Sequence, residues 1–380
     1  MARIVLDGYI ARYPLGGMAS WVLQYLLGFK KLGHDVYFVE KCSMPDECYD
    51  PRRKVMSDDC NTGVEFLDAL LTRFGLEGRW CVVDFHGREH GIARAAMRDI
   101  LRSADLFVDL HTEGAWMEEA QDAGARVLID GEPGFFQMKM VKKMRAGETL
   151  PQYDFYYTNG HNVGRPNYRA PTAGKEWRWI FNPIDIDLFR DAPPDGQAFT
   201  TIMNWQSHSP FDFDGRVYGQ KDVEFEKFMQ LPGLCSVPLE VAVTGAGTPA
   251  DRLTAAGWRV IDAQVVTSSF DSFIDYIVRS AGEFSVCKGG YVDTWSGWFG
   301  DRSAAYLAAG RPVVCQDTGF SEHLPCGRGL FAIDTAEAAA AAFEEISSDR
   351  ARHSEGAREL AGDFLDAPKV MGRFLDEIGI

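Results

Sequence analysis

The chain has 380 residues, of which 46% are hydrophobic and 12% are aromatic, and this composition excludes a disordered, collagen-like or low-complexity protein. Its 39 basic and 55 acidic residues leave a formal net charge of −16, which disfavours a protein that binds nucleic acid or an anionic membrane through its overall field. At roughly 150 residues per domain, the length predicts two to three domains.

The first half of the sequence alternates short apolar runs with stretches of helical periodicity. Residues 3–7 predict a buried strand, a loop with Gly16 and Gly17 follows, and residues 18–34 place apolar side chains at helical spacing. The next apolar run completes a βαβ unit, which is the crossover that parallel strands need. Further strands of this series are predicted at residues 35–40, 80–85, 105–110, 126–131 and 153–158.

A segment rich in proline and aspartate, residues 182–197, separates this series from a second one. Such a composition is typical of a linker or hinge. The chain closes with alanine-rich helical stretches from about residue 335. The sequence therefore predicts the α/β class, with two doubly wound Rossmann-like domains. Strands of the second domain are predicted at residues 199–205, 239–245, 258–263, 284–289 and 311–317.

Eight cysteines are spread over the chain without CxxC spacing: Cys42, Cys48, Cys60, Cys81, Cys235, Cys287, Cys315 and Cys326. In a long chain without a visible signal peptide, we expect reduced thiols and a cytoplasmic location rather than a disulfide framework. A zinc site is not expected either, because no paired Cys/His spacing stands out. No apolar run reaches about 18 residues, so no membrane span is predicted.

The most informative segment covers residues 295–325. Arg302 and Ser303 follow Gly300, where a helix is predicted to begin. Backbone N–H groups at a helix start, together with an arginine and a hydroxyl group, can bind a diphosphate. A surface helix capped by polar residues is the alternative.

Four stretches of the chain resemble the GT-B glycosyltransferases of the glycogen-synthase-like superfamily. The phrase AYLAAGRPVVCQDTG is similar to their nucleotide-sugar segment, and GGMASWVLQYLLGFKKLGHDVYFVE is similar to their opening. NPIDIDLF is similar to their crossover between domains, and Lys221 in YGQKDVEFEKF to the lysine that contacts the donor diphosphate. The resemblance covers most of the chain. It implies an acceptor-side domain of residues 1–190 plus about 360–380, which faces a donor-side domain of residues 191–360 across a cleft.

The resemblance implies a metal-independent hexosyltransferase that moves a sugar from a nucleoside-diphosphate sugar to a hydroxyl group of a small molecule or glycan. The expected donor is a UDP-sugar such as UDP-glucose, and no other cofactor is expected. The residues assigned to the donor diphosphate are Lys221, Gly300, Asp301, Arg302 and Ser303. The residues expected around the rest of the donor and the cleft are Gly16, Gly17, Trp205, Gln206, Asp317, Thr318 and Gly319.

The chain also departs from the family pattern. Gly297 and Ala305 stand where retaining members carry two glutamates, and the His-Gly-Gly phrase of plant-type inverting members is missing. The first glutamate contacts the donor sugar in the family and the second holds the donor ribose. The donor sugar and the choice between retention and inversion therefore stay open.

The acceptor is expected on the first domain, because ligands of open α/β sheets bind at the carboxyl ends of the strands. His111 and Glu113 follow one predicted strand, and Glu132 follows the next. Glu113 and His111 are the candidates for a catalytic base, which must reach the acceptor hydroxyl. A solvent-exposed loop carboxylate is the alternative interpretation of Glu113.

Residues 139–178 are basic, whereas the chain as a whole is acidic. They carry eight basic and three acidic side chains, with aromatic residues between them. Arg165 and Arg169 in this stretch are candidates for acceptor binding. Basic groups beside stacking rings suit a phosphate-bearing acceptor, so DNA with 5-hydroxymethyl-pyrimidine bases is the alternative acceptor. A solvated face with ordinary core aromatics is the simpler interpretation.

Three further interpretations of the sequence concern a metal site and the activity of the protein. Asp185 and Asp187 form a DxD pattern, but it falls in the linker, where a solvated hinge is favoured over a metal site. A UDP-sugar epimerase would use the same donor site without an acceptor. A non-catalytic sugar-nucleotide binding protein would explain the missing glutamates.

Overall fold

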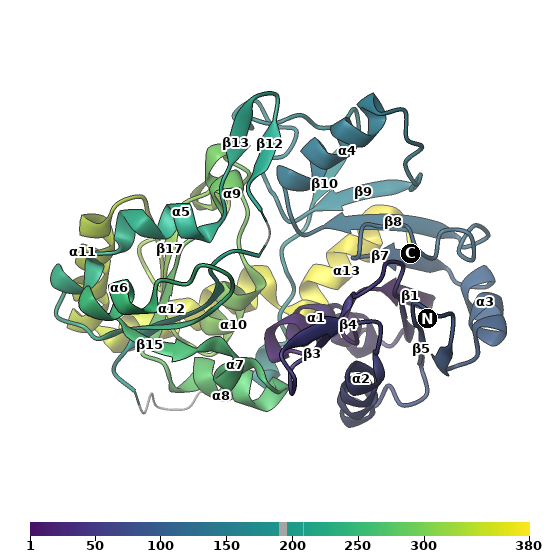
Figure 1. Ribbon diagram of the computed structural model, residues 1–380, viewed down its shortest axis with the longest axis horizontal. Helices are drawn as coiled ribbons and strands as arrows, with labels where there is room; N and C mark the ends of the chain where they lie inside the picture. The colour runs from purple at the N-terminus through teal and green to yellow at the C-terminus, as the bar shows by residue number, and fades with distance from the viewer. Residues whose placement is uncertain (190–195, 208) are drawn as a thin grey trace.

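The computed structural model describes residues 1–189, 196–207 and 209–380. The chain forms two lobes, each built on one largely parallel β-sheet with helices packed on it (Figure 1). The predicted α/β class with two doubly wound sheets is thus confirmed. The expected boundary between the domains, at residues 190 and 191, lies outside the described residues.

Within the described residues, the first sheet has eight strands, and only its edge strand β6 pairs antiparallel. Both faces are buried: Ile4 and Leu6 pack in one apolar cluster and Val5 between them packs in another. Because strand residues alternate between faces, a strand apolar at every position is covered on both sides. In spatial order the strands are β10 (Trp177–Trp179), β9 (Phe155–Thr158), β8 (Ala125–Asp130), β7 (Leu106–Asp109), β1 (Arg3–Asp7), β2 (Asp35–Lys41), β5 (Trp80–Val83) and β6 (Glu89–Gly91).

Helices cover both faces of this sheet. Helix α1 has no polar outer face, since Val22, Leu23, Leu26 and Phe29 are all fully buried. It lies between the sheet and the last helix of the chain, which explains why it is apolar almost all round. The helices of this lobe are α1 (Gly16–Lys31), α2 (Asn61–Arg73), α3 (Arg94–Arg102) and α4 (Phe135–Arg145).

The second sheet has six strands that are all parallel. They are, in spatial order, β15 (Arg259–Asp262), β14 (Leu239–Thr244), β11 (Phe199–Asn204), β16 (Gly282–Ser285), β17 (Val313–Gln316) and β18 (Leu330–Ile333). The helices around it are α5 (Lys221–Phe225), α6 (Ala250–Ala255), α7 (Ala263–Thr267), α8 (Phe270–Arg279), α9 (Gly289–Asp293), α10 (Asp301–Ala308), α11 (Ala336–Ser348) and α12 (Arg350–Leu360).

The chain returns to the first lobe at its end. Helix α13 (Ala367–Ile378) packs on α1, and Tyr157 of β9 donates a hydrogen bond to Glu377. The turn into α13 pairs with the connection between the lobes through a bridge between Ile184 and Asp366. In Figure 1 the yellow end of the chain accordingly lies beside the first, blue-coloured sheet.

Several short elements were not predicted from the sequence. Strands β6, β10 and β18 lie at sheet edges, where strands are short and carry a weak apolar signal. Two small hairpins leave the sheets altogether: β3 (Cys48–Asp50) with β4 (Val55–Ser57), and β12 (Phe211–Phe213) with β13 (Arg216–Tyr218). Within the described residues, no helix has the length and the apolar composition that crossing a bilayer requires.

Candidate functional site

A cavity of about 620 Å³ lies between the two lobes. On the first lobe it is lined by the loops that follow β1, β7 and β8, and on the second lobe by the starts of α5 and α10 and the loop before α9. These segments follow the carboxyl ends of parallel strands, which is where open α/β sheets bind ligands. The volume is that of a small-molecule site.

His111 and Glu113 come together on the first lobe, in the loop after β7. The Nε2 atom of the buried His111 lies 3.4 Å from Oε2 of Glu113. Arg12 contacts both side chains and is itself paired with the buried Glu47. Burial alone would raise the pKa of Glu113, but the hydrogen bond from His111 and the charges of His111 and Arg12 outweigh it and hold that pKa below its usual value. Glu113 is therefore an ionised carboxylate at neutral pH, about 38% exposed toward the cavity.

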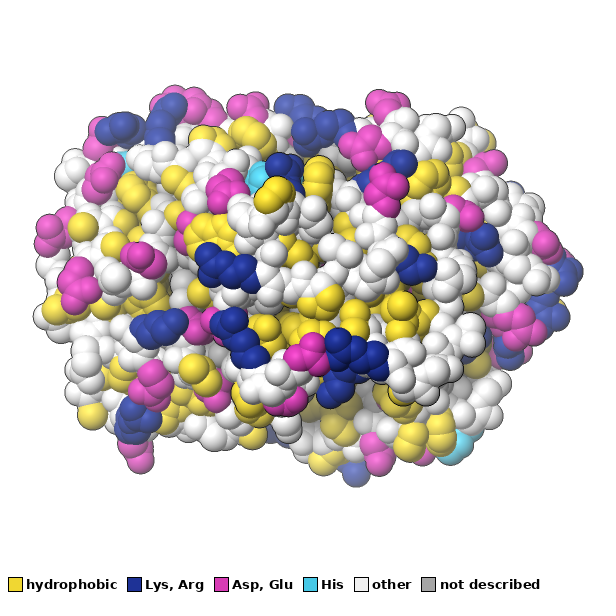
Figure 2. Space-filling model, turned by 90° about the horizontal axis from the view of Figure 1, so that it is seen from above, with side chains coloured by type: hydrophobic (Ala, Val, Ile, Leu, Met, Phe, Trp, Pro, Cys, Tyr) yellow, Lys and Arg dark blue, Asp and Glu magenta, His cyan; other side chains and the backbone are white. Residues whose placement is uncertain are grey.

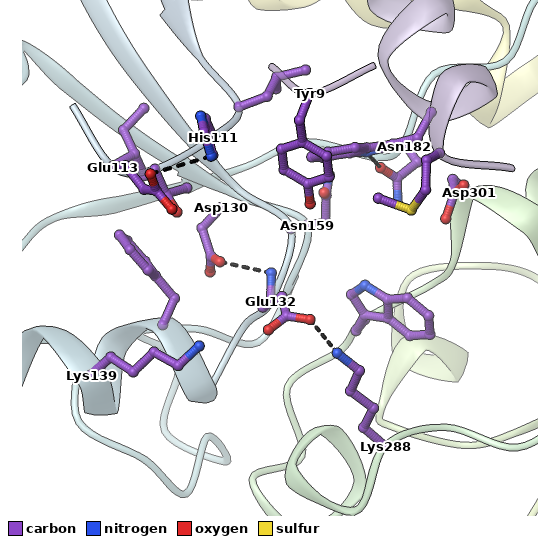
Figure 3. A pocket seen from close by; sticks show the side chains of 18 of the residues that line it. Tyr9, His111, Glu113, Asp130, Glu132, Lys139, Asn159, Asn182, Lys288 and Asp301 are labelled. Atoms are coloured by element: carbon purple, nitrogen blue, oxygen red, sulfur yellow. Dashed lines mark hydrogen bonds and ion pairs between the residues drawn. The ribbon is translucent and has the colours of Figure 1, made fainter. Parts of the chain in front are cut away.

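Glu132 and Lys288 join the two lobes across the cavity. Glu132 follows β8 of the first sheet, Lys288 precedes α9 of the second, and their side chains form an ion pair. Figure 3 shows this pair below Asp130, with Tyr9, Asn159 and Asn182 on the opposite wall. The pair satisfies the charge of Lys288 without a ligand.

Lys221 lines the cavity from the second lobe and has no ion-pair partner among the described residues. It begins α5 and lies near Arg302 and Lys288. Removal from water, and then the charges of Arg302 and Lys288, lower the pKa of Lys221 to about 7. Three cationic side chains that converge on one wall form a site for an anion.

Arg302 lines the cavity, but its guanidinium is already engaged by the second sheet. Its Nε donates to the fully buried Glu283 at 2.7 Å and its Nη2 donates to Ser285 at 2.6 Å, while Nη1 contacts the carbonyl of Ile202. These contacts fix the guanidinium at the carboxyl ends of β11 and β16. Gly300 and Asp301 line the cavity at the start of α10, whereas Ser303 is only 2% exposed and lies outside the lining.

The expected glycine loop does not line the cavity. A side-chain carbon on Gly16 would strike the carbonyl oxygen of Ser269, and one on Gly17 would touch Phe273. Both glycines therefore allow α1 to approach α8 of the second lobe. This packing explains why small residues stand there.

Five other residues expected around the donor also lie outside the cavity lining. Trp205 is buried against Phe225, and Gln206 donates to Asp222. Asp317, Thr318 and Gly319 form a turn after β17. In this turn Asp317 accepts from the backbone N–H of Gly319, and Thr318 donates to the carbonyl of Trp298.

Most basic side chains of the stretch at residues 139–178 contact other side chains of the protein. Arg165 lies over the ring of Trp179 and Arg169 over that of Trp295, and neither lines the cavity. Arg145 pairs with Asp214 of the β12–β13 hairpin. Lys139 and Lys143 differ, since both line the cavity from α4 and are exposed without an ion pair among the described residues.

The two aspartates of the DxD pattern, in the connection between the lobes, form ion pairs with a lysine. Lys31 at the end of α1 lies 2.5 Å from Oδ1 of Asp185 and 2.8 Å from Oδ2 of Asp187. Asp185 also accepts from the backbone N–H of Asp187. Both carboxylates thus tie α1 to the connection.

Several lining residues were missed from the sequence. Lys288 and Asp130 stand at the ends of predicted strands, so the rule that placed Glu113 would also have found them. Burial raises the pKa of Asp130 to about 6, although hydrogen bonds from the side chains of Gln137 and Thr158 and from the backbone of Glu132 lower it. Tyr9 and Arg12 belong to no motif or spacing that would mark them in the sequence. They line the cavity because they lie in the loop that follows the carboxyl end of β1.

Comparisons with known proteins agree on the fold. No protein-family model matches the chain, and no curated protein matches its sequence. Solved structures match over the whole chain. Anabaena HepE in complex with UDP and glucose superposes with a TM-score of 0.58 at 11% identity, covering 100% of both chains.

Two further matches are of the same kind. AviGT4, a glycosyltransferase involved in avilamycin A biosynthesis, gives a TM-score of 0.56 at 12% identity over 99% of this chain and 97% of its own. An alpha-glucosyltransferase in complex with UDP and a 13-mer DNA gives 0.58 at 11% identity over 100% of both chains. The expected GT-B fold is thereby confirmed.

Proposed function

We propose that this GT-B protein is a glycosyltransferase that moves a sugar from a UDP-sugar to a hydroxyl group of a small molecule or glycan. The observation that carries the proposal is the arrangement of the cavity. Lys221, with no ion-pair partner among the described residues, faces it beside the start of α10 on one lobe, and the His111–Glu113 pair faces it on the other. Solved neighbours with the same fold hold UDP, and one holds UDP-glucose.

The donor half of the cavity suits a leaving diphosphate. In the transfer, the acceptor oxygen bonds to the anomeric carbon of the sugar, the bond from that carbon to the β-phosphate oxygen breaks, and UDP leaves with the electron pair. Lys221 and the backbone N–H groups at Gly300 and Asp301 stabilise the charge that develops on UDP. Arg302 adds positive charge from a position fixed by Glu283.

The acceptor half holds the base. In a transfer with inversion, Glu113 takes the proton of the acceptor hydroxyl as the new bond forms. His111 and Arg12 orient this carboxylate and keep it ionised until then. Proton transfer of this kind contributes roughly a hundredfold to ten-thousandfold in rate.

The acceptor half is lined mainly by apolar side chains, which favours a small molecule or glycan over DNA. These side chains are Leu128, Phe136, Met140, Leu150, Pro151 and Tyr156. Figure 2, which looks down on α4 and the β12–β13 hairpin, shows basic side chains interspersed with acidic and apolar ones rather than a continuous basic stripe. A protein that follows a DNA backbone presents such a stripe.

A donor screen followed by product analysis tests the proposal. UDP and UDP-glucose are expected to raise the melting temperature of the full chain more than GDP or ADP, because a ligand of the native state stabilises it. Mass spectrometry after incubation with UDP-glucose should then find a hexose added to a phenolic or glycan acceptor. An oligonucleotide with 5-hydroxymethyluracil should stay unmodified.

Other results would contradict the proposal in distinct ways. Epimerised UDP-sugar without an acceptor would identify an epimerase. A melting shift with UDP-glucose but no transfer to any acceptor class would identify a binding protein. Glucosylated DNA would support the glycosyltransferase activity but contradict the small-molecule or glycan acceptor.

A further inference from the structure

A second group of reactive side chains lies in the first lobe, outside the cavity. Cys60 at the start of α2, Asp84 after β5 and His90 in β6 each point one ligand atom at the same spot, and these atoms all lie within 4.8 Å of one another. The Sγ atom of Cys60 lies 3.7 Å from Nε2 of His90, and this Nε2 lies 3.6 Å from Oδ2 of Asp84. None of the three lines the cavity.

These distances are those of a tetrahedral metal site. Zinc binds sulfur, nitrogen and oxygen ligands at about 2.0 to 2.3 Å, so neighbouring ligand atoms of a tetrahedron lie about 3.3 to 3.8 Å apart. We propose that Cys60, Asp84 and His90 bind a structural zinc ion and that Cys48 is its fourth ligand. The buried thiol of Cys48, which is 2% exposed, lies near Cys60 but outside this group of three ligand atoms, so its side chain would turn toward the ion to complete the set.

The surroundings of the three residues support a bound cation. Asp84 is held by the backbone N–H groups of His86 and Arg88, so its second oxygen keeps a fixed direction. The guanidinium of Arg88 already donates a hydrogen bond to that oxygen at 2.6 Å, so a zinc ion would share the carboxylate with it. Two thiolates and one carboxylate, set against zinc and this guanidinium, leave the site electrically neutral. A buried metal site is the arrangement in which such ligands avoid the cost of unpaired charge.

The ion would hold in place a loop that buries few apolar side chains. Residues 42–60 leave the first sheet after β2 and carry the β3–β4 hairpin, whose Val55 and Met56 are exposed. Cys48 is the first residue of β3 and Cys60 is the last residue of the excursion, whereas Asp84 and His90 belong to the β5–β6 hairpin. Zinc would therefore tie the β3–β4 hairpin and the end of the excursion to the edge of the sheet.

This loop connects the metal site to the cavity and to the other lobe. Its Glu47 pairs with Arg12, which contacts His111 and Glu113. Its Lys54 pairs with Asp262 at 3.0 Å, and the carbonyl of Pro51 accepts from Gln264. The site would thus keep Arg12 in place without taking part in any reaction.

Metal analysis of the purified full chain tests the proposal. After dialysis against zinc and removal of free metal, elemental mass spectrometry should find about one zinc per chain, as in other closed structural sites. Cys60→Ser and His90→Ala should each lose it. Cys235→Ser, which removes a thiol of the second lobe, should retain it.

Two further measurements do not depend on metal counting. Trypsin should cut the exposed sequence Arg52-Arg53-Lys54 faster after chelation or in His90→Ala than in the zinc-loaded protein. Cobalt in place of zinc should give a thiolate-to-metal absorption band, and this band should weaken in Cys48→Ser. An unchanged band would remove Cys48 from the ligand set.

Two results would overturn the zinc site. The first is zinc-free protein after dialysis, and the second is His90→Ala with unchanged zinc, a variant that also decides the matter if Cys60→Ser does not fold. A disulfide between Cys42 and Cys48, whose sulfur atoms lie 3.6 Å apart, would overturn the assignment of Cys48 as the fourth ligand.

Discussion

Lys221 is the residue on which the donor site depends most, because its charge has no carboxylate partner among the described residues. We expect Lys221→Met to weaken UDP binding roughly tenfold to a hundredfold, since hydrogen bonds to charged groups contribute about 1.5–3 kcal/mol. The melting temperature without ligand should not fall, because an uncompensated, desolvated charge is removed. Calorimetric titration with UDP measures the first effect. Lys142→Met is the matched control, since Lys142 lies on α4 and contacts the carbonyl of Asp212 outside the cavity lining.

The lowered pKa of Lys221 also predicts a pH dependence. With a pKa of about 7 in the free protein, Lys221 is mostly neutral at pH 8 and above. A bound diphosphate favours the charged form and raises this pKa, so UDP binding takes up a proton and weakens as the pH rises through 7. Titrations at pH 8 in buffers of different ionisation enthalpy should report an uptake close to one proton. Binding without proton uptake, or uptake that persists in Lys221→Met, would contradict the assignment.

Glu113 is the test of the acceptor side. Glu113→Gln keeps the shape of the side chain but removes its ability to accept a proton. We expect kcat to fall roughly a hundredfold to ten-thousandfold, as for loss of a general base, with no change in UDP affinity. Initial rates at saturating donor, beside UDP titrations, check this. Glu118→Gln, an exposed glutamate of the same segment that does not line the cavity, should behave as the unaltered protein.

Among the elements, the contact between α1 and α13 is the closest helix packing that joins the end of the chain to its beginning. A Cβ on Gly28 would lie 2.5 Å from Cγ of Met371 and 3.1 Å from the carbonyl oxygen of Ala367. We therefore expect Gly28→Ala to lower the free energy of unfolding by about 1–3 kcal/mol, the usual cost of overpacking. Gly372→Ala on α13 points into open space and should instead stabilise the protein by roughly 0.5–1 kcal/mol, the helix preference of alanine over glycine. Thermal unfolding of both variants measures the difference.

The elements also show how far the sequence could lead. Buried parallel strands such as β1 and β17 carry consecutive apolar residues, so the strands predicted at residues 3–7 and 311–317 could be located from the sequence. The carboxyl ends of β7 and β8 then locate His111, Glu113 and Glu132 in the cavity by geometry alone. The glycine pair at the start of α1 gives the same local signal as a ligand loop. Only the tertiary packing of α1 on α8 distinguishes the two. Arg302 was predicted to bind the diphosphate, but its contacts with Glu283 of β16 and the carbonyl of Ile202 in β11 follow from the tertiary fold and have no signal in the sequence.

At the scale of the whole molecule, the two lobes share an apolar interface as well as a cavity. Phe135 of α4 is fully buried with its ring 5.8 Å from that of Tyr291, and Phe74 of the first lobe meets Phe270 of the second at 5.6 Å. Ion pairs at the outer rim of the interface, such as Arg73 with Asp271, are exposed and contribute little. The connection between the lobes is thus stabilised mainly by burial of aromatic surface, which high salt does not weaken.

This interface predicts that the lobes unfold together. Calorimetry of the unaltered chain should show one transition, in low and in high salt alike. Phe135→Ala removes the ring that lies against Tyr291, at a cost of about 3–5 kcal/mol for a buried phenylalanine, and should separate the transition into two. Phe343→Ala, the same change inside the second lobe, leaves the interface intact and should lower the melting temperature of the single transition without dividing it. Two transitions in the unaltered chain would mean that the lobes are independent. Closure on the donor would then have to come from the ligand rather than from contacts already formed between α4 and α9.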